Sequence, residues 1–410
     1  MTQTKTKAVE EPAKRVATTI YLDNHATTPL DPAVLDAMLP YLKESFGNPA
    51  STHSYGVRAQ YAVDRARLQV AHAINANEDE ILFTAGATES NNAVLKGVFD
   101  YYQDKKPHFI VSSIEHKCIL EAAKHIEKQG AEVTVLKVNA KGQITPAALK
   151  SALKPNTVLV SIMFANNEIG SINPIKKLAA ICHEQDVLLH TDAAQAVGKF
   201  PIDVKDLGID LLSASGHKFY GPKGVGFVYI KKDVQSKITP LLDGGGQEGH
   251  LRSGTLNVPG IVGLGKAIEL ATTNADEQFW HYLKLRNRLY AHLVETFPDL
   301  IVNGPDIPEL EELEALGDVT TIAETLERLP HNLNITLPSI DPAQLGHIYS
   351  VAFSSTSACS SGEVEPSYVL MDIGRSADEA KASLRFGIGR FNTESEVDEA
   401  AQLLARALAV

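Results

Sequence analysis

The chain has 410 residues, which at about 150 residues per domain predicts two to three domains. A chain of this length buries enough surface to be stable without disulfide bonds. Its 38 Lys and Arg against 50 Asp and Glu give a formal net charge of -12, which argues against a nucleic-acid-binding protein. The three cysteines, Cys118, Cys182 and Cys359, form no CxxC pair, which argues against a disulfide scaffold and a cysteine-based zinc site.

Residues 1–19 mix basic side chains with Glu10 and Glu11 and lack the apolar run of a secretory signal. We expect a flexible polar leader there. No apolar run in the chain approaches the ~20 residues that a membrane span needs. These features predict a cytoplasmic protein that binds neither membranes nor nucleic acid.

Short apolar runs alternate with helix-length amphipathic segments between about residues 80 and 230. We predict strands at 81–83, 109–111, 132–138, 157–163, 187–190, 211–214 and 225–230, with helices at 89–102 and 117–129. This alternation indicates an α/β fold with a mostly parallel, mixed sheet covered by helices on both faces. Ligands of such sheets bind at the carboxyl ends of the strands.

The pattern changes after Gly260. A long helical stretch (261–297) precedes an acidic segment, two or three strands and a terminal helix (394–408). We therefore expect a large domain over 20–265, whose N-terminal segment contacts a smaller α+β domain over 266–410. The acidic residues of about 309–326 predict an exposed loop or helix. Residues 260–267 nearly fit a P-loop, but Ala267 replaces the Ser or Thr, which favours a small-residue packing face instead.

Three segments that follow predicted strands carry candidate chemistry. Residues 84–89 open a helix and could offer free N–H groups to a phosphate, although Thr88 could equally be a helix cap. Asp192 ends a strand, where a buried carboxylate needs a cation or a donor. Lys218 lies in a glycine-bounded loop and is a candidate Schiff-base amine, with a surface lysine in a hairpin as the alternative.

Together these residues predict a site for pyridoxal 5′-phosphate. This cofactor needs a phosphate cradle, an acid for its ring nitrogen, a lysine for its aldehyde and a partner for its ring face. Thr88, Asp192, Lys218 and His116 supply these four functions. Their coincidence is much more specific than any one of them.

The motifs, in chain order, resemble those of the cysteine desulfurases of iron–sulfur assembly, within the class V, fold-type-I aminotransferase-like enzymes. The resemblance covers about residues 20–408. Its motifs are YLDNHATTP (21–29), FGNPAS (46–51), ATES (87–90), EHK (115–117), NNEIG (166–170), SGHK (215–218), RSGT (252–255), SAC (357–359), EPSY (365–368) and RF (385–386).

The resemblance implies a fold-type-I pyridoxal phosphate enzyme that acts on L-cysteine as a homodimer. Lys218 would carry the cofactor, His116 would stack on its ring and assist proton transfer, and Asp192 would keep its ring nitrogen protonated. The other implied contacts are Gln195 and Asn167 to the phenolic oxygen and the substrate side, Ala87, Thr88, Ser215 and His217 to the phosphate, Thr255 to that phosphate from the neighbouring subunit, and Arg385 to the substrate carboxylate.

Cys359 is the residue that identifies the implied reaction as the transfer of sulfur from L-cysteine. It lies among small polar residues expected to be mobile, whereas Cys118 and Cys182 lie in apolar helical contexts typical of buried packing thiols. Lys218 would remove the α-proton of L-cysteine, and the Cys359 thiolate would attack the substrate sulfur. Alanine and a persulfide result, and the persulfide passes to an iron–sulfur scaffold or another acceptor protein. No intrinsic metal is expected, with Cys359 at most a transient cluster ligand.

The length of the cysteine loop resembles that of the housekeeping and nitrogen-fixation branch of these enzymes. Three alternatives stay open at this point. The sequence does not separate a selenocysteine lyase, or a desulfurase acting on both substrates, because sulfur and selenium differ too little, and a plain aminotransferase would leave Cys359 and its loop unexplained. A catalytically silent sulfur-relay subunit would not need Lys218 and His116.

Overall fold

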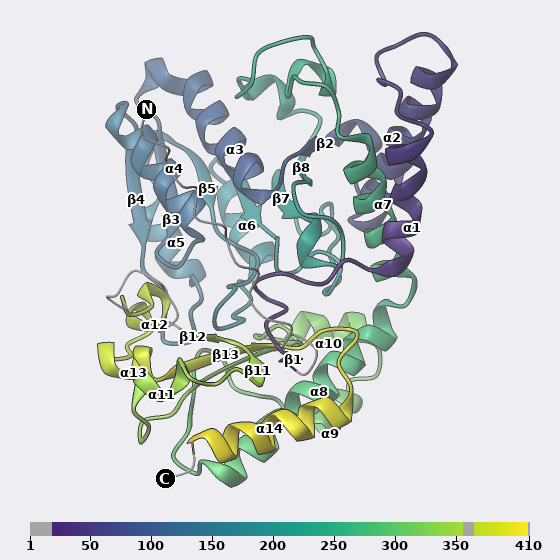
Figure 1. Ribbon diagram of the computed structural model, residues 1–410. Helices are drawn as coiled ribbons and strands as arrows, with labels where there is room; N and C mark the ends of the chain where they lie inside the picture. Colours follow the sequence, from purple (N-terminus) through teal and green to yellow (C-terminus); the bar gives the residue numbers. More distant parts are fainter. Residues whose placement is uncertain (1–18, 356–364, 409–410) are drawn as a thin grey trace, which may run out of the picture.

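The computed structural model describes residues 19–355 and 365–408. The predicted leader therefore lies outside the described residues, apart from Thr19. A seven-stranded sheet has the order β2-β8-β7-β6-β5-β3-β4 (Figure 1). Its strands are β2 (Ile81–Thr84), β3 (His108–Ser112), β4 (Glu132–Leu136), β5 (Thr157–Ser161), β6 (Leu188–Asp192), β7 (Leu211–Ser215) and β8 (Gly226–Ile230).

The predicted α/β sheet is confirmed, and every predicted strand of this region is present. Strands β4, β3, β5, β6 and β7 pair in parallel, whereas β8 runs antiparallel to both of its neighbours. The boundaries differ by a few residues. Strand β6 continues to Asp192, so this carboxylate belongs to the strand end itself.

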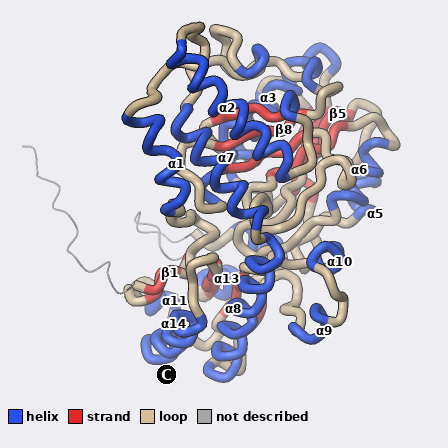
Figure 2. Tube along the Cα trace, turned by 90° about the vertical axis from the view of Figure 1, so that its right-hand side faces the viewer, coloured by secondary structure: helices blue, strands red, loops and turns tan. Residues whose placement is uncertain are grey.

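Helices cover both faces of this sheet because its strands are buried on both sides. Helices α1, α2 and α7 lie side by side on one face (Figure 2), and α5 and α6 belong to the same core. Helices α3 and α4 pack on the opposite face. The helices are α1 (Pro32–Lys43), α2 (Ser54–Ala73), α3 (Ala87–Tyr102), α4 (Lys117–Lys128), α5 (Pro146–Ala152), α6 (Ile175–His183) and α7 (Val258–Thr273).

The glycines of α7 form the predicted packing face rather than a P-loop. A Cβ at Gly263 would lie 2.6 Å from Met38 Sδ of α1, and one at Gly265 would lie 2.7 Å from Ala66 Cβ of α2. Both distances are far below van der Waals contact. Small residues therefore let α7 approach α1 and α2 closely.

A second, smaller body lies below the large sheet in Figure 1. Its antiparallel sheet has the order β12-β13-β10-β9 and packs against α8 and α14, while β1 pairs in parallel with β11. The elements are β1 (Ile20–Tyr21), α8 (Ala275–Thr296), β9 (Ile301–Val302), β10 (Asn332–Thr336), α11 (Pro342–Leu345), β11 (Val351–Ala352), β12 (Ser354–Ser355), α12 (Tyr368–Asp372), α13 (Ala377–Lys381), β13 (Ser383–Gly387) and α14 (Glu394–Leu408).

The long helical stretch predicted over 261–297, with only weak breaks, is confirmed: it consists of two helices, α7 and α8, with one break. Asn274 lies between them with φ -121° and ψ 38°, outside the helical region, and asparagine is favoured at helix ends. The expected domain boundary after residue 265 falls within α7, whose Ile268 lies in the core of the large sheet together with Phe279 and Leu283 of α8.

The acidic segment is not simply the exposed loop or helix that its composition predicts. It forms α9 (Leu310–Glu314) and α10 (Val319–Thr325), and Leu313, Val319 and Ile322 are buried in the core of the large body. The carboxylates face solvent while the apolar positions anchor the segment. No helix in the described part of the chain is long and apolar enough to cross a membrane.

Candidate active site

A cavity of about 930 Å³ opens where the large sheet meets the small body. Its walls include the last residues of β6 and β7, the first turn of α3, the residue before α4, and Arg385 of β13. The predicted site residues that line it are Ala87, Thr88, His116, Asn167, Asp192, Gln195, Ser215, His217, Lys218 and Arg385. Thr255 is exposed and does not line this cavity, and Cys359 lies outside the described residues.

Lys218 ends the short 3-10 turn η4 (Gly216–Lys218), directly after β7. Its Nζ donates hydrogen bonds to the main-chain oxygens of His25 and Ala26, both at 2.7 Å. Burial, and after it the positive charge of Arg385, lowers the pKa of Lys218 to about 8. A sizeable fraction of the amine is therefore unprotonated near neutral pH, as a nucleophilic or basic lysine requires.

Asp192 is buried at the end of β6. Its Oδ2 accepts a hydrogen bond from Asn91 Nδ2 at 2.7 Å, and its Oδ1 accepts one from the N–H of Ala194 at 3.0 Å. Both donors are neutral, and Asp192 has no ion pair within residues 19–355 and 365–408. A buried carboxylate with only neutral donors is complementary to a protonated ring nitrogen.

The first turn of α3 offers main-chain N–H groups to the cavity, because these groups have no acceptor inside the helix. Gly86, with φ 144°, holds the cap position, so the alternative that Thr88 caps the helix is wrong. A Cβ at Gly86 would lie 3.3 Å from Ser215 Oγ, which shows how closely this turn approaches β7. Beside it, burial and then the charge of Lys218 lower the pKa of His217 to about 4.

His116 caps α4 and faces the cavity. Its Nδ1 accepts the N–H of Cys118 at 3.2 Å and lies 3.0 Å from Cys118 Sγ. An accepting Nδ1 puts the proton of the neutral imidazole on Nε2. The prediction that Cys118 is a buried packing thiol is correct only in part, because it packs against the core beside α3 and α4 but is half-buried and also contacts His116. The same prediction for Cys182 of α6 is confirmed.

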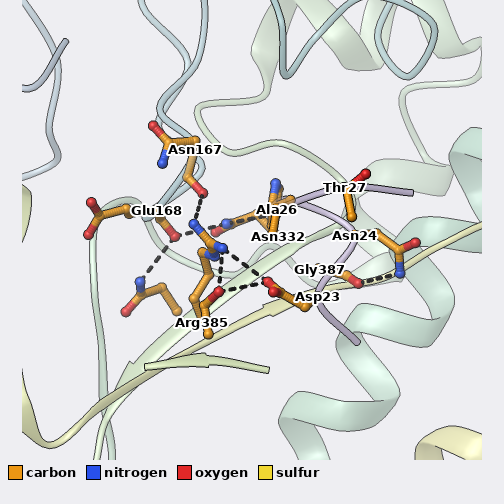
Figure 3. A network of polar contacts seen from close by, with 12 residues as sticks. Asp23, Asn24, Ala26, Thr27, Asn167, Glu168, Asn332, Arg385 and Gly387 are labelled. Carbon is orange, nitrogen blue, oxygen red and sulfur yellow. Dashed lines mark hydrogen bonds and ion pairs between the residues drawn. The ribbon is translucent and has the colours of Figure 1, made fainter. Parts of the chain in front are cut away.

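Arg385 reaches the cavity from β13 (Figure 3). Its Nη2 forms an ion pair with Asp23 Oδ1 at 3.0 Å and a hydrogen bond to Ser354 Oγ at 2.5 Å, and its Nη1 donates to the main-chain oxygen of Asn167 at 3.2 Å. The buried Nε has no partner among the described residues. The guanidinium is thus oriented at the cavity wall by contacts from both bodies.

His25 lines the cavity although no role was predicted for it from its place in the YLDNHATTP motif. It is fully buried, with Nδ1 2.9 Å from Gln195 Oε1 and Nε2 3.0 Å from Asn332 Nδ2. Burial, and then the charge of Lys199, lowers the pKa of His25 well below its usual range, so the ring is neutral. Gln195 also donates from Nε2 to the main-chain oxygen of His25 at 3.1 Å.

Residues 20–400 match the family model described as Aminotransferase class-V. The chain belongs to the class-V aminotransferase family. It is 45% identical over 396 residues to the cysteine desulfurase of Mus musculus, covering 96% of this chain and 82% of that protein. It is 46% identical over 386 residues to the cysteine desulfurase IscS of Anaeromyxobacter dehalogenans (strain 2CP-C), covering 94% of this chain and 91% of that protein.

A solved structure described as a NifS-like protein superposes on this class-V chain with a TM-score of 0.84 at 35% identity. The match covers 95% of this chain and 98% of that one. The fold-type-I architecture predicted from the motifs is confirmed by this likeness.

Enzymes of this class-V family depend on pyridoxal 5′-phosphate, which confirms the predicted cofactor. The residues of the cavity also fit it. Asp192 lacks a cationic partner in the described structure, the Gly86 turn presents free N–H groups, and Lys218 has a lowered pKa. A carboxylate, an anion-binding turn and an amine are the groups that a pyridine ring, a phosphate and an aldehyde require.

Proposed function

We propose that this chain is a cysteine desulfurase, which converts L-cysteine to L-alanine and receives the sulfur as a persulfide on Cys359. The persulfide then passes to an iron–sulfur scaffold or another acceptor protein. The observation that carries the proposal is one cavity that holds Lys218, the Asp192 carboxylate and the oriented Arg385 guanidinium. The names of the relatives support the same activity.

The contacts of each side chain indicate its role in the proposed reaction. Pyridoxal phosphate, when bound, supplies an electron sink for the pair left on the substrate α-carbon. Arg385 binds the substrate carboxylate, since a planar guanidinium matches a carboxylate and this one is already oriented by Asp23. Lys218 Nζ takes the α-proton, because an amine with a pKa of about 8 can act as a base near neutral pH. Asp192 would keep the ring nitrogen protonated, and His116 would cover the ring.

The remaining site residues complete the proposed cofactor contacts. Gln195 and Asn167 would contact the ring oxygen and the substrate side, and the phosphate would be held by Ala87, Thr88, Ser215 and His217.

Cys359 is the proposed sulfur acceptor. Its thiolate attacks the substrate sulfur, a sulfur–sulfur bond forms, and the electron pair of the broken carbon–sulfur bond stays with the substrate carbon, which a proton then completes as alanine. Cys359 follows Ser355 by four residues, a length of chain that spans at most about 14 Å. Ser355 belongs to β12, which pairs with β13 beside Arg385. This supports access of Cys359 to the cavity.

The test replaces Cys359 with Ala and with Ser and measures alanine and protein-bound persulfide from L-cysteine. We expect both variants to bind the cofactor with an unchanged visible absorbance band and to form no persulfide. Cys182→Ala is the matched control, because this thiol is buried in α6 away from the cavity. Persulfide formation by Cys359→Ala at the wild-type rate would exclude Cys359. The same assay with L-selenocysteine in place of L-cysteine compares alanine release from the two substrates and so tests the selenocysteine lyase alternative.

The proposal includes a homodimer in which Thr255 completes the phosphate site of the neighbouring subunit. Thr255 is exposed and absent from the lining of its own cavity, which supports this role. Differently tagged Lys218→Ala and Thr255→Ala chains, inactive or impaired alone, should regain activity when co-expressed, because one site of the mixed dimer is intact. A monomer by light scattering, with no such recovery, contradicts the proposal.

A cytoplasmic location is also part of the proposal. Cell fractionation tests it, and recovery of the protein in an organelle contradicts it.

A further inference from the structure

The side-chain amide of Asn91 forms hydrogen bonds with both Asp192 and Cys118, two residues that belong to different segments of the sequence. Asn91 lies in α3 and is completely buried. Its Nδ2 donates one hydrogen bond to Asp192 Oδ2 at 2.7 Å and another to Cys118 Sγ at 3.2 Å. An amide nitrogen carries two protons and has no acceptor capacity, so each proton serves one of these contacts.

The direction of the next bond follows from these donors. Cys118 Sγ accepts from Asn91 and lies 3.0 Å from His116 Nδ1. Because Nδ1 accepts the main-chain N–H of Cys118 at 3.2 Å, it carries no proton, so the thiol is the donor and shares the Nδ1 lone pair with that N–H. Burial, and then the charge of Asp192, raises the pKa of Cys118 to about 11, which keeps the thiol protonated. The hydrogen bonds therefore run from Asn91 to Cys118 and from Cys118 to His116, and the Thr88 side chain also contacts this thiol.

The orientation of the amide is determined by its nitrogen. Asn91 Oδ1 is buried and has no partner in the described part of the chain. A flipped amide would place this oxygen against the Asp192 carboxylate, which can only accept hydrogen bonds. In the observed orientation Oδ1 has no partner, but Nδ2 contacts both Asp192 and Cys118. These two contacts therefore determine the orientation of the Asn91 amide.

We infer that Asn91 and Cys118 are positioning residues that bind Asp192 and His116 into one hydrogen-bonded unit. The inference rests on the proposed function, in which Asp192 meets the ring nitrogen and His116 covers the ring. The unit fixes the carboxylate and the rotation of the imidazole together. It leaves the proton of His116 on Nε2, the ring nitrogen that Cys118 does not engage.

A simple packing role for Cys118 predicts the opposite response to substitution. If the thiol only fills space, Cys118→Val is tolerated and Cys118→Ser, which places a hydroxyl among half-buried side chains, is not. If the thiol relays a hydrogen bond, Ser replaces it because a hydroxyl both accepts and donates, whereas Val cannot. Cys182, a packing thiol of α6, supplies the matched pair Cys182→Val and Cys182→Ser.

The first measurement is steady-state turnover of L-cysteine with saturating cofactor. We expect Cys118→Val to lower kcat roughly three- to tenfold, the effect of one neutral hydrogen bond, with KM within about twofold. Cys118→Ser should keep kcat within about twofold. Asn91→Leu should lower kcat at least as much as Cys118→Val, because Asp192 also loses one of its two donors. Both Cys182 variants should keep the wild-type kcat.

The second measurement is ¹⁵N NMR of the histidine rings, with and without cofactor, with the His116 signals assigned by their loss in His116→Gln. The Nδ1 resonance should move in Cys118→Val, where the imidazole loses the thiol donor, and stay in place in Cys118→Ser. A wild-type Nδ1 resonance in Cys118→Val overturns the inference, whatever happens to kcat. If the wild-type enzyme releases no alanine, the proposed function fails, while the resonance of the cofactor-free chain still tests the hydrogen-bonded unit.

Discussion

Replacing Lys199 with Met should stabilise the protein most at low pH. Lys199 follows β6 and is 6% exposed, and its Nζ lies 3.4 Å from His331 Nε2. No carboxylate in the described structure forms an ion pair with it. Burial, and then the positive charges of Lys218 and Arg390, lowers the pKa of Lys199 to about 7. The facing imidazole of His331 is itself kept neutral by burial.

The sign of the effect follows from proton binding. The unfolded chain keeps the Lys199 proton up to the usual pKa of 10.5, whereas the folded chain releases it near pH 7. Between these values the unfolded state binds more protons, so the free energy of unfolding rises with pH. Each pH unit in this range is worth about 1.4 kcal/mol, which gives about 2 kcal/mol between pH 7 and pH 9. Methionine has a similar shape and no proton, so it removes this dependence.

The assay is urea unfolding of both proteins, saturated with cofactor, at pH 7 and pH 9. The stability gained by Lys199→Met should shrink by about 2 kcal/mol from pH 7 to pH 9. Lys150→Met on the exposed face of α5 is the control, because it removes the same amine where solvent surrounds it. An equal Lys199→Met difference at both pH values would refute the assignment of a buried amine without an ion pair.

Two further predictions concern the substrate carboxylate and the acidic segment. Arg385→Lys should raise KM for L-cysteine roughly tenfold or more with a smaller change in kcat, because one amine cannot contact Asp23, the carbonyl of Asn167 and a substrate together; steady-state kinetics checks this, and an unchanged KM contradicts it. Ile322→Ala should lower the free energy of unfolding by about 2–5 kcal/mol, since this side chain is fully buried, whereas Glu312→Gln on the exposed face should change it by less than about 0.5 kcal/mol. Equal effects in urea unfolding would show that the segment is not anchored.

The main parts of the site could be predicted because they depend on local sequence and strand direction. Asp192 ends β6, the SGHK motif follows β7, and His116 follows β3. In a mostly parallel sheet these positions share one edge, so the strand pattern alone brings them together. The cofactor follows from that convergence, since few ligands need an amine, an acid and an anion-binding turn at once.

The contacts between segments could not be predicted, because no local pattern records them. His25 meets Gln195 across 170 residues, and Arg385 meets Asp23 across 362. Cys118 shows a different limit. Its apolar helical context is typical of a packing residue, yet its place two residues after His116, in the first turn of α4, decides what it touches. Likewise, Gly86 is the N-cap residue of α3, although Thr88 is the residue type that N-caps favour.

The reactivity of Lys218 depends on the small body as much as on the large sheet. Its amine is held by two main-chain carbonyls, of His25 and Ala26, rather than by a carboxylate. A paired carboxylate would favour the charged amine, whereas neutral carbonyls orient it without preventing burial from lowering its pKa. The segment that supplies these carbonyls follows β1, which pairs with β11, and is tied to β13 through Asp23 and Arg385. The same ion pair that orients the proposed substrate-binding group therefore also fixes the segment that holds the lysine.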